Sequence, residues 1–371
     1  MDVNQKAKSY IKGLDGLRGI AAILVILGHI ELLKKVFGFK NVYDGGGPFY
    51  IYLGALAVTF FFVLSGFLIT YLLLNEREKN NNISIKNFYL RRVLRIWPVY
   101  YLLFIIGFIA FPFIINSNLL LPNHIPKDNY WRSFLFNFLL LPNFVKPSNP
   151  IAFQSWSIGV EEQFYIFWPL IIARITSLKK LFIAMVLIIV SIYLLRSAMI
   201  VNNFSDYNFQ FLVKINQFFG ACRFDNMAIG GLLAIFYFKK PHLEINFFSK
   251  VIIIISLSIL LIKQPAIGFG LDNVIAAIIF ALLIALVAYA KNISFLEHKI
   301  FKFLGRISYG IYMYHVIGII IAINIIRYFN RSFNGEGFYN IILYILTIII
   351  TILIANVSYI YLEKYFLKFK K

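Results

Sequence analysis

Residues 14–33 read LDGLRGIAAILVILGHIELL, an apolar run of transmembrane length that holds a guanidinium, Arg18, and an imidazole, His29. His29 follows Arg18 by eleven positions. At 100° per residue, this spacing places both side chains on one face of a helix, roughly 16 Å apart along its axis. Ionisable side chains in a lipid-spanning helix are costly unless they face a protein interior or an aqueous cavity. The stretch therefore predicts a membrane helix that carries a functional site.

The whole chain is apolar. Of its 371 residues, 60% are hydrophobic and 14% are charged, with a mean hydropathy of +0.78, whereas soluble domains are nearer one half apolar and one quarter charged. This composition indicates an integral membrane protein, and we expect residues 1–371 to form a single transmembrane domain. The lone cysteine, Cys222, excludes an internal disulfide and a cysteine-based metal site, and we predict no bound metal.

Apolar stretches near 20 residues predict ten transmembrane helices. With the N-terminus inside, two thirds of the 36 lysines and arginines fall on the cytoplasmic side, which supports this orientation. These flanking cations explain the net charge of +20, so no nucleic-acid partner is predicted. We expect an all-α polytopic protein, with about ten helices around a central polar cavity and both termini cytoplasmic. The predicted spans are residues 14–33, 51–74, 93–115, 157–174, 181–200, 217–238, 246–262, 272–290, 304–326 and 338–362, with an interfacial run at 131–141.

Two of the five histidines, His29 and His315, fall within predicted spans. Imidazole is well suited to take a proton from a hydroxyl group near neutral pH. An isolated buried histidine more often serves as a hydrogen-bonding group between helices, but the face shared with Arg18 favours a functional role for His29. His315 shares a face with Tyr312 in LGRISYGIYMYHV (residues 304–316). For these two residues, helix packing and substrate binding are equally supported.

Two adjacent carboxylates, Glu161 and Glu162, lie in the span WSIGVEEQFYIFWP (residues 156–169). Neighbours on a helix point about 100° apart, so they face different partners. We expect one of them, with Tyr165 four residues after Glu161, to line the cavity and bind substrate. The other is expected to pair with a cation such as Arg223. Arg223 and Asp225 of RFDNMAIGG (residues 223–231) are candidates for binding or for a structural network with these carboxylates.

A third group of polar residues lies in FYLRRVLRIWP (residues 88–98), at the cytoplasmic end of a predicted span. Arg92 and Arg95 are three residues apart and share a helix face. Such arginines fix topology, and arginine is also suited to bidentate phosphate contacts. A phosphate-bearing cytoplasmic donor is therefore a candidate ligand of Arg92 and Arg95.

Together these stretches resemble the membrane acyltransferase 3 family, in its stand-alone form without a C-terminal esterase-like domain. The resemblance runs in the family's order from Leu14 to Phe366. It is carried by LDGLRGIAAILVILGH, FFVLSGFLIT, LRRVLRIWPVYYL, SWSIGVEEQFYIFWPL, RFDNMAIGGLLA, LGRISYGIYMYHV and SYIYLEKYF.

The resemblance implies a multi-pass O-acyltransferase of the bacterial inner membrane, most often an O-acetyltransferase. Such enzymes move an acyl group from cytoplasmic acyl-CoA, usually acetyl-CoA, to a hydroxyl of a surface glycan such as lipopolysaccharide or of a lipid-linked glycan. The donor is a substrate, and no permanently bound cofactor is implied. By the family motif, His29 and Arg18 carry over as the essential pair, and Arg92 and Arg95 as the cytoplasmic arginine motif.

Several alternatives stay open at this point. His29 would act as general base or as transient acyl acceptor, and Glu161 or Glu162 would orient the acceptor or hold the tautomer of His29. A glycan or lipid transporter would favour broken helices in inverted repeats, which the sequence does not show. A lipid-linked glycan polymerase would favour a large extracytoplasmic loop.

Overall fold

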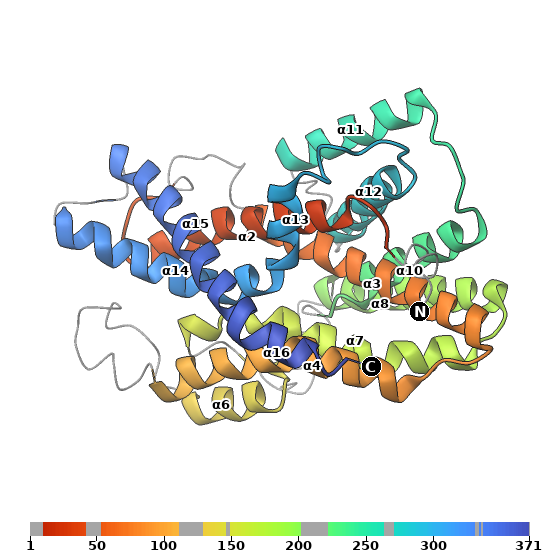
Figure 1. Ribbon diagram of the computed structural model, residues 1–371, viewed down its shortest axis with the longest axis horizontal. Coiled ribbons are helices and arrows are strands. Elements are labelled where there is room, and N and C mark those ends of the chain that lie inside the picture. The colour runs from red at the N-terminus through yellow and green to blue at the C-terminus, as the bar shows by residue number, and fades with distance from the viewer. Residues whose placement is uncertain are drawn as a thin grey trace. The chain divides into compact units, whose positions relative to one another are not determined.

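The computed structural model describes residues 10–41, 53–110, 129–145, 149–201, 222–262, 271–330, 334 and 337–370, and over these residues it is helical without a strand (Figure 1). The all-α prediction is confirmed for this part of the chain. In lipid, a helix satisfies its backbone hydrogen bonds within one segment, which is why apolar runs of this length fold as helices. The longer helices are α2 (Leu14–Val36), α3 (Leu53–Asn80), α4 (Ile85–Phe104), α7 (Ser155–Arg174), α8 (Leu178–Val201), α10 (Phe224–Lys239), α11 (Phe247–Ile262), α12 (Leu271–Ala288), α14 (Ser308–Phe329) and α15 (Phe338–Ser358).

Short helical elements connect or extend these helices. A π-helix, η2 (Ile105–Ala110), continues α4, and a second one, η6 (Tyr359–Glu363), leads from α15 into α16 (Lys364–Leu367). The run predicted to be interfacial forms the nine-residue α6 (Tyr130–Phe138). The remaining short elements are η3 (Pro142–Phe144), η4 (Pro150–Ala152) and α13 (Lys299–Arg306).

Within the described residues, seven helices are long and apolar enough to span a membrane. The chain is thus a multi-pass membrane protein. The three other predicted spans correspond to α7, which carries the two glutamates, and to α10 and α11, which have 16 residues each. Residues 51–52, 111–115 and 217–221 of the predicted spans lie outside the described residues. The count of ten spans and the side of the termini stay predictions.

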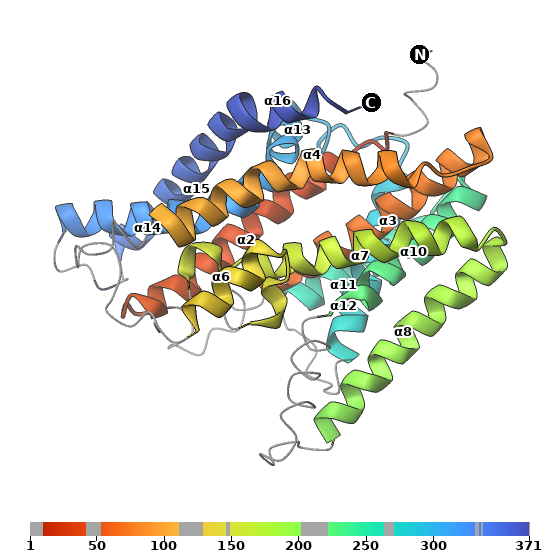
Figure 2. The ribbon, with the colours of Figure 1, turned by 90° about the horizontal axis from the view of Figure 1, so that it is seen from below.

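The chain divides into two compact units. The first comprises Met1–Arg18, Val58–Phe88 and Val160–Lys302. In it, α10 packs against α8 and α12, and α11 lies beside α12 (Figure 2). The backbones of α3 and α10 are in close contact at Gly66. A Cβ atom on this residue would collide with the carbonyl of Met227. Small residues allow this close approach between membrane helices.

The second unit comprises Gly19–Ala57, Tyr89–Gly159 and Phe303–Lys371. Its α14 and α15 lie side by side (Figures 1 and 2), with Gly310 of α14 facing Ala355 of α15. The segment before α7 is docked onto α14, because Gln154 Nε2 donates a hydrogen bond of 2.5 Å to the carbonyl of Met313. The other end of this segment is held by Asn149, whose side-chain amide donates to the carbonyl of Gly107 in η2.

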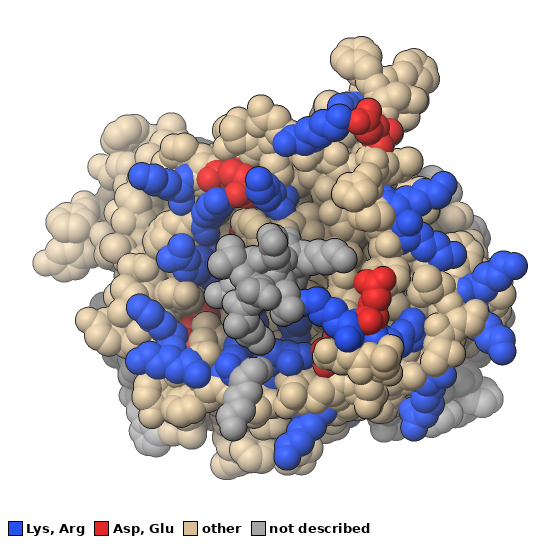
Figure 3. Space-filling view, turned by 45° about the vertical axis from the view of Figure 1, so that its right-hand side comes forward, with Lys and Arg blue, Asp and Glu red and all other residues tan. Residues whose placement is uncertain are grey.

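Lysine and arginine dominate the exposed charge. They number 36 against 16 aspartates and glutamates in the chain, and in the view of Figure 3 the exposed cations clearly outnumber the exposed acids. This excess is typical of a membrane protein whose helices are flanked by cations.

Candidate active site

The second unit brings His29 of α2 and His315 of α14 into direct contact, although 286 positions separate them. His29 Nδ1 lies 2.9 Å from His315 Nε2. The ring planes are inclined by only 22°, with centroids 4.8 Å apart. On its other side, His315 Nδ1 lies 2.6 Å from the backbone carbonyl oxygen of Tyr312. The two histidines form a dyad anchored to the backbone of α14.

The two rings of this histidine dyad differ in accessibility. His315 is fully buried, with 0% of its surface exposed, whereas His29 is partly exposed. Phe153 meets the His29 ring edge to face at 5.8 Å. Of the two histidines, His29 is therefore the more accessible one.

A close crossing of α2 and α3 shapes the Nε2 side of His29. A Cβ atom on Gly28 would lie 2.6 Å from the backbone nitrogen of Gly54, so the two helices meet backbone to backbone. A Cβ atom on Gly54 would lie 3.9 Å from His29 Nε2, in ordinary contact distance. The residue of α3 next to His29 Nε2 is therefore a glycine, which has no side chain.

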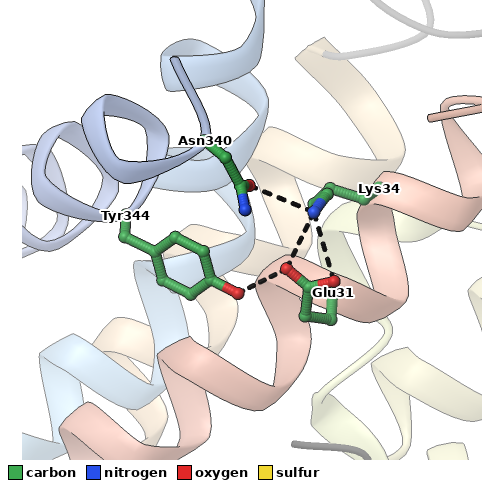
Figure 4. A network of polar contacts seen from close by, with 4 residues as sticks. All are labelled: Glu31, Lys34, Asn340 and Tyr344. Atoms are coloured by element: carbon green, nitrogen blue, oxygen red, sulfur yellow. Dashed lines mark hydrogen bonds and ion pairs between the residues drawn. The ribbon is translucent and has the colours of Figure 1, made fainter. Parts of the chain in front are cut away.

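A buried ion pair follows His29 on the same helix (Figure 4). Lys34 Nζ lies 3.0 and 3.2 Å from the two carboxylate oxygens of Glu31 and donates a third hydrogen bond of 3.1 Å to Asn340 Oδ1. The hydroxyl of Tyr344 donates to Glu31. Both charged side chains are almost fully buried. The network ties the end of α2 to α15, two residues beyond the partly exposed imidazole.

Glu31 and Lys34 were not among the predicted site residues. A signal was available, because a carboxylate and an ammonium group three positions apart in a membrane helix can pair on one face. The predicted span ends at residue 33, before Lys34, whereas α2 continues to Val36.

In the first unit, Glu161 is held by two hydroxyl groups. Ser65 Oγ donates to one carboxylate oxygen at 3.0 Å, and the Tyr165 hydroxyl donates to the other at 2.8 Å. Glu161 and Tyr165, four positions apart on α7, are therefore joined by a hydrogen bond, and their part in lining a cavity stays a prediction. Glu162, its neighbour on α7, is also partly buried.

The first unit also holds a buried ion pair that the sequence did not predict. Asp225 pairs with Arg196 of α8, at 3.0 Å between Nη1 and Oδ2, and Arg196 Nη2 also donates to the carbonyl of Cys222 at 2.9 Å. Arg223 directly precedes α10. Arg196 was missed because a single arginine near the end of an apolar helix reads as a flanking topology residue.

The sequence matches the family described as "Acyltransferase domain" over residues 11–359. The chain belongs to the acyltransferase 3 family. It is 28% identical over 378 residues to O-acetyltransferase OatA of Staphylococcus aureus (strain NCTC 8325), covering 95% of this chain and 57% of OatA. It is also 27% identical over 397 residues to a predicted O-acetyltransferase of Staphylococcus aureus (strain COL), covering 98% of this chain and 58% of that protein. The chain thus spans less than three fifths of the curated relatives it matches. No solved structure matches it.

The region matched to the acyltransferase 3 family includes every predicted site residue, but the structure distributes them over several clusters. His29, His315 and Tyr312 lie together in the second unit. The Tyr312 hydroxyl donates to the carbonyl of Gln154 at 3.2 Å and lies 2.5 Å from Ser157 Oγ, so it holds the segment before α7. Its role in substrate binding stays a prediction.

Arg18, which the family resemblance pairs with His29, lies near the start of α2. Its Nη1 is 3.7 Å from Asp15 Oδ1, and both side chains are partly exposed. The helix begins after Gly13, which adopts a positive φ of 81° and whose N–H donates to Glu297 at 2.6 Å. Arg18 and His29 therefore belong to one continuous helix, as predicted.

The arginines Arg92 and Arg95, which the resemblance implies as a motif, lie on α4 in the second unit. Lys370, close to the C-terminus, lies near them in space. Burial and the positive charges of the α4 arginines lower the pKa of Lys370 from 10.5 to about 8. The Tyr309 hydroxyl donates to the carbonyl of Ile96 at 2.9 Å, which ties α4 to α14. The cationic group consists of Arg91, Arg92, Arg95 and Lys370.

Within the described part of the chain, no three His, Cys, Asp or Glu side chains gather as metal ligands would.

Proposed function

We propose that this protein is a bacterial inner-membrane O-acyltransferase that moves an acyl group, by preference acetyl, from cytoplasmic acyl-CoA to a hydroxyl of a surface or lipid-linked glycan. The observation that carries the proposal is the partly exposed His29, backed by buried His315, in a chain that belongs to the acyltransferase 3 family. The names of the Staphylococcus relatives support acetyl as the group transferred.

In the proposed reaction, His29 Nε2 takes the proton of the acceptor hydroxyl as that oxygen attacks the thioester carbonyl carbon. The tetrahedral intermediate then collapses, and the carbon–sulfur bond breaks. The coenzyme A sulfur leaves with the bonding pair and takes the proton back from the His29 imidazolium. Donor and acceptor are consumed one for one, and His29 returns to its neutral form.

Arg18 is assigned to the donor. Arg18 lies roughly 16 Å from His29 along α2. The two side chains together are shorter than this distance, so they do not contact the same atom of the substrate. Arg18 therefore binds a part of acyl-CoA remote from the thioester, such as a phosphate or the pantetheine arm. Within the second unit, the α4 arginines and Lys370 are assigned to the phosphates of coenzyme A.

The test compares surface glycan from wild-type cells, cells that lack the gene, and cells that produce His29→Ala, by NMR before and after mild alkali. We expect an alkali-labile acyl ester only in the wild type, with His29→Ala present in the membrane at normal amounts. His242→Ala, which removes an exposed histidine, is the control and should retain the ester. An ester retained in His29→Ala would overturn the proposal, and an altered chain length would indicate a polymerase instead.

A further inference from the structure

We infer that His315 is a positioning residue that holds His29 in the Nδ1–H tautomer, so that the reactive lone pair lies on His29 Nε2. The catalytic consequence rests on the function proposed above, but the tautomer itself does not.

The backbone carbonyl of Tyr312 determines which ring nitrogen of His315 carries a hydrogen. A carbonyl oxygen only accepts hydrogen bonds, so His315 Nδ1, 2.6 Å from the Tyr312 oxygen, must carry a hydrogen. If His315 is neutral, its Nε2 then has a lone pair and no hydrogen. The ring therefore presents an acceptor toward His29.

The position of the hydrogen on His29 follows from its position on His315. His29 Nδ1 is 2.9 Å from His315 Nε2, and two lone pairs at that distance would repel, so His29 Nδ1 must donate. The alternative, in which His315 donates from both nitrogens, places a full positive charge on a ring with 0% exposure. Burying a charge in this way is costly. In the neutral arrangement, His29 Nδ1 donates to His315 Nε2, and His315 Nδ1 donates to the carbonyl of Tyr312 in α14.

This arrangement leaves His29 Nε2 without a hydrogen, on the side where Gly54 has no side chain. Free histidine favours the opposite tautomer, with its hydrogen on Nε2, which cannot act as a base at that atom. When His29 accepts a proton, its hydrogen bond to His315 becomes charge-assisted and therefore stronger. His315 thus acts on the reaction through His29 and does not touch substrate.

Two substitutions separate the tautomer from packing. In His315→Gln, the amide oxygen can take the place of Nε2 and still accept from His29. In His315→Asn, the shorter side chain reaches only the Nδ1 position and leaves His29 without its acceptor. Side-chain ¹⁵N NMR of histidine-labelled protein in detergent reads the tautomers directly, because the chain has only five histidines, and His29→Ala assigns the His29 signals.

We expect the Nδ1–H tautomer for His29 in wild type and His315→Gln, and the Nε2–H tautomer in His315→Asn. With acetyl-CoA and alkali-treated glycan as substrates, His315→Asn should lower kcat about 100-fold with little change in KM for acetyl-CoA, and His315→Gln should recover most of the loss. An Nε2–H tautomer in the wild type, or equal loss of kcat in both variants, would overturn the inference. Because the NMR experiment on wild type needs neither activity nor a variant of His315, a failed function and a failed tautomer assignment are distinguishable.

Discussion

The histidine dyad of α2 and α14 and the ion pair of α8 and α10 are both polar contacts held among apolar helices, yet they differ in charge and accessibility. Arg196 and Asp225 are both buried and pair at 3.0 Å. In the histidine dyad, only His315 is fully buried, and His29 is partly exposed beside Gly54. One contact is charged and enclosed, and the other joins a fully buried histidine to a partly exposed one.

This difference separates a structural polar contact from a reactive one. In the ion pair, each charge compensates the other for its lost hydration, so removing one partner leaves an uncompensated buried charge. In the neutral histidine dyad no charge is buried, so its loss should cost little folding free energy. We therefore expect changes in the ion pair to affect stability, and changes at the histidine dyad to affect turnover.

The largest effect is expected for Asp225→Asn. The substitution keeps the shape of the side chain but leaves the guanidinium of Arg196 without its charged partner, and should lower the free energy of unfolding by about 3–5 kcal/mol. The measurement is chemical unfolding in detergent, followed by circular dichroism.

Two controls sharpen this result. His315→Gln, at the neutral dyad, should lower the free energy of unfolding by less than about 1.5 kcal/mol. The double variant Arg196→Met, Asp225→Leu should recover much of the stability, because no unpaired charge is left. If Asp225→Asn were no less stable than His315→Gln, the distinction between the two contacts would be wrong.

The next effect concerns the space beside His29. In Gly54→Ala, the new methyl group would lie 3.9 Å from His29 Nε2 without a clash, and should hinder the approach of an acceptor hydroxyl. We expect kcat/KM for the glycan acceptor to fall about 10-fold, since small displacements of a reacting group reduce rates strongly. Steady-state kinetics with acetyl-CoA and alkali-treated glycan measures this.

Gly28→Ala is the matched control for the helix crossing itself. Its Cβ would come within 2.6 Å of the Gly54 nitrogen, so it should destabilise the protein by about 1–3 kcal/mol through overpacking. Gly54→Ala should leave the free energy of unfolding nearly unchanged. Wild-type kinetics in Gly54→Ala would show that the acceptor does not approach on this side.

The two kinds of contact also show what the sequence can predict. Contacts within one helix follow from spacing: Arg18 and His29 share a helix, and Tyr165 bonds Glu161 four positions away. Most helix positions agree with the apolar runs to within a few residues. Contacts between helices do not follow in the same way. Helices that are apolar on all sides give no indication of which face meets which neighbour, so neither the partner of His29 nor that of Asp225 was predicted.

The smallest expected effect lies outside both contacts, in the cationic group at the end of the chain. Lys370 has a pKa lowered to about 8 by burial and by the α4 arginines, so it is protonated at pH 7 and largely neutral at pH 9. An anionic ligand binds the protonated form better, and the affinity for coenzyme A should therefore fall as the pH rises through 8. In Lys370→Met, binding at pH 7 should weaken about threefold, as expected for a partly exposed ion pair, and this fall with pH should disappear.

Lys368→Met, which removes an exposed lysine two positions earlier, should bind like the wild type in titration calorimetry. If Lys370→Met kept the full pH dependence, the proton would come from another group and Lys370 would not belong to the donor site.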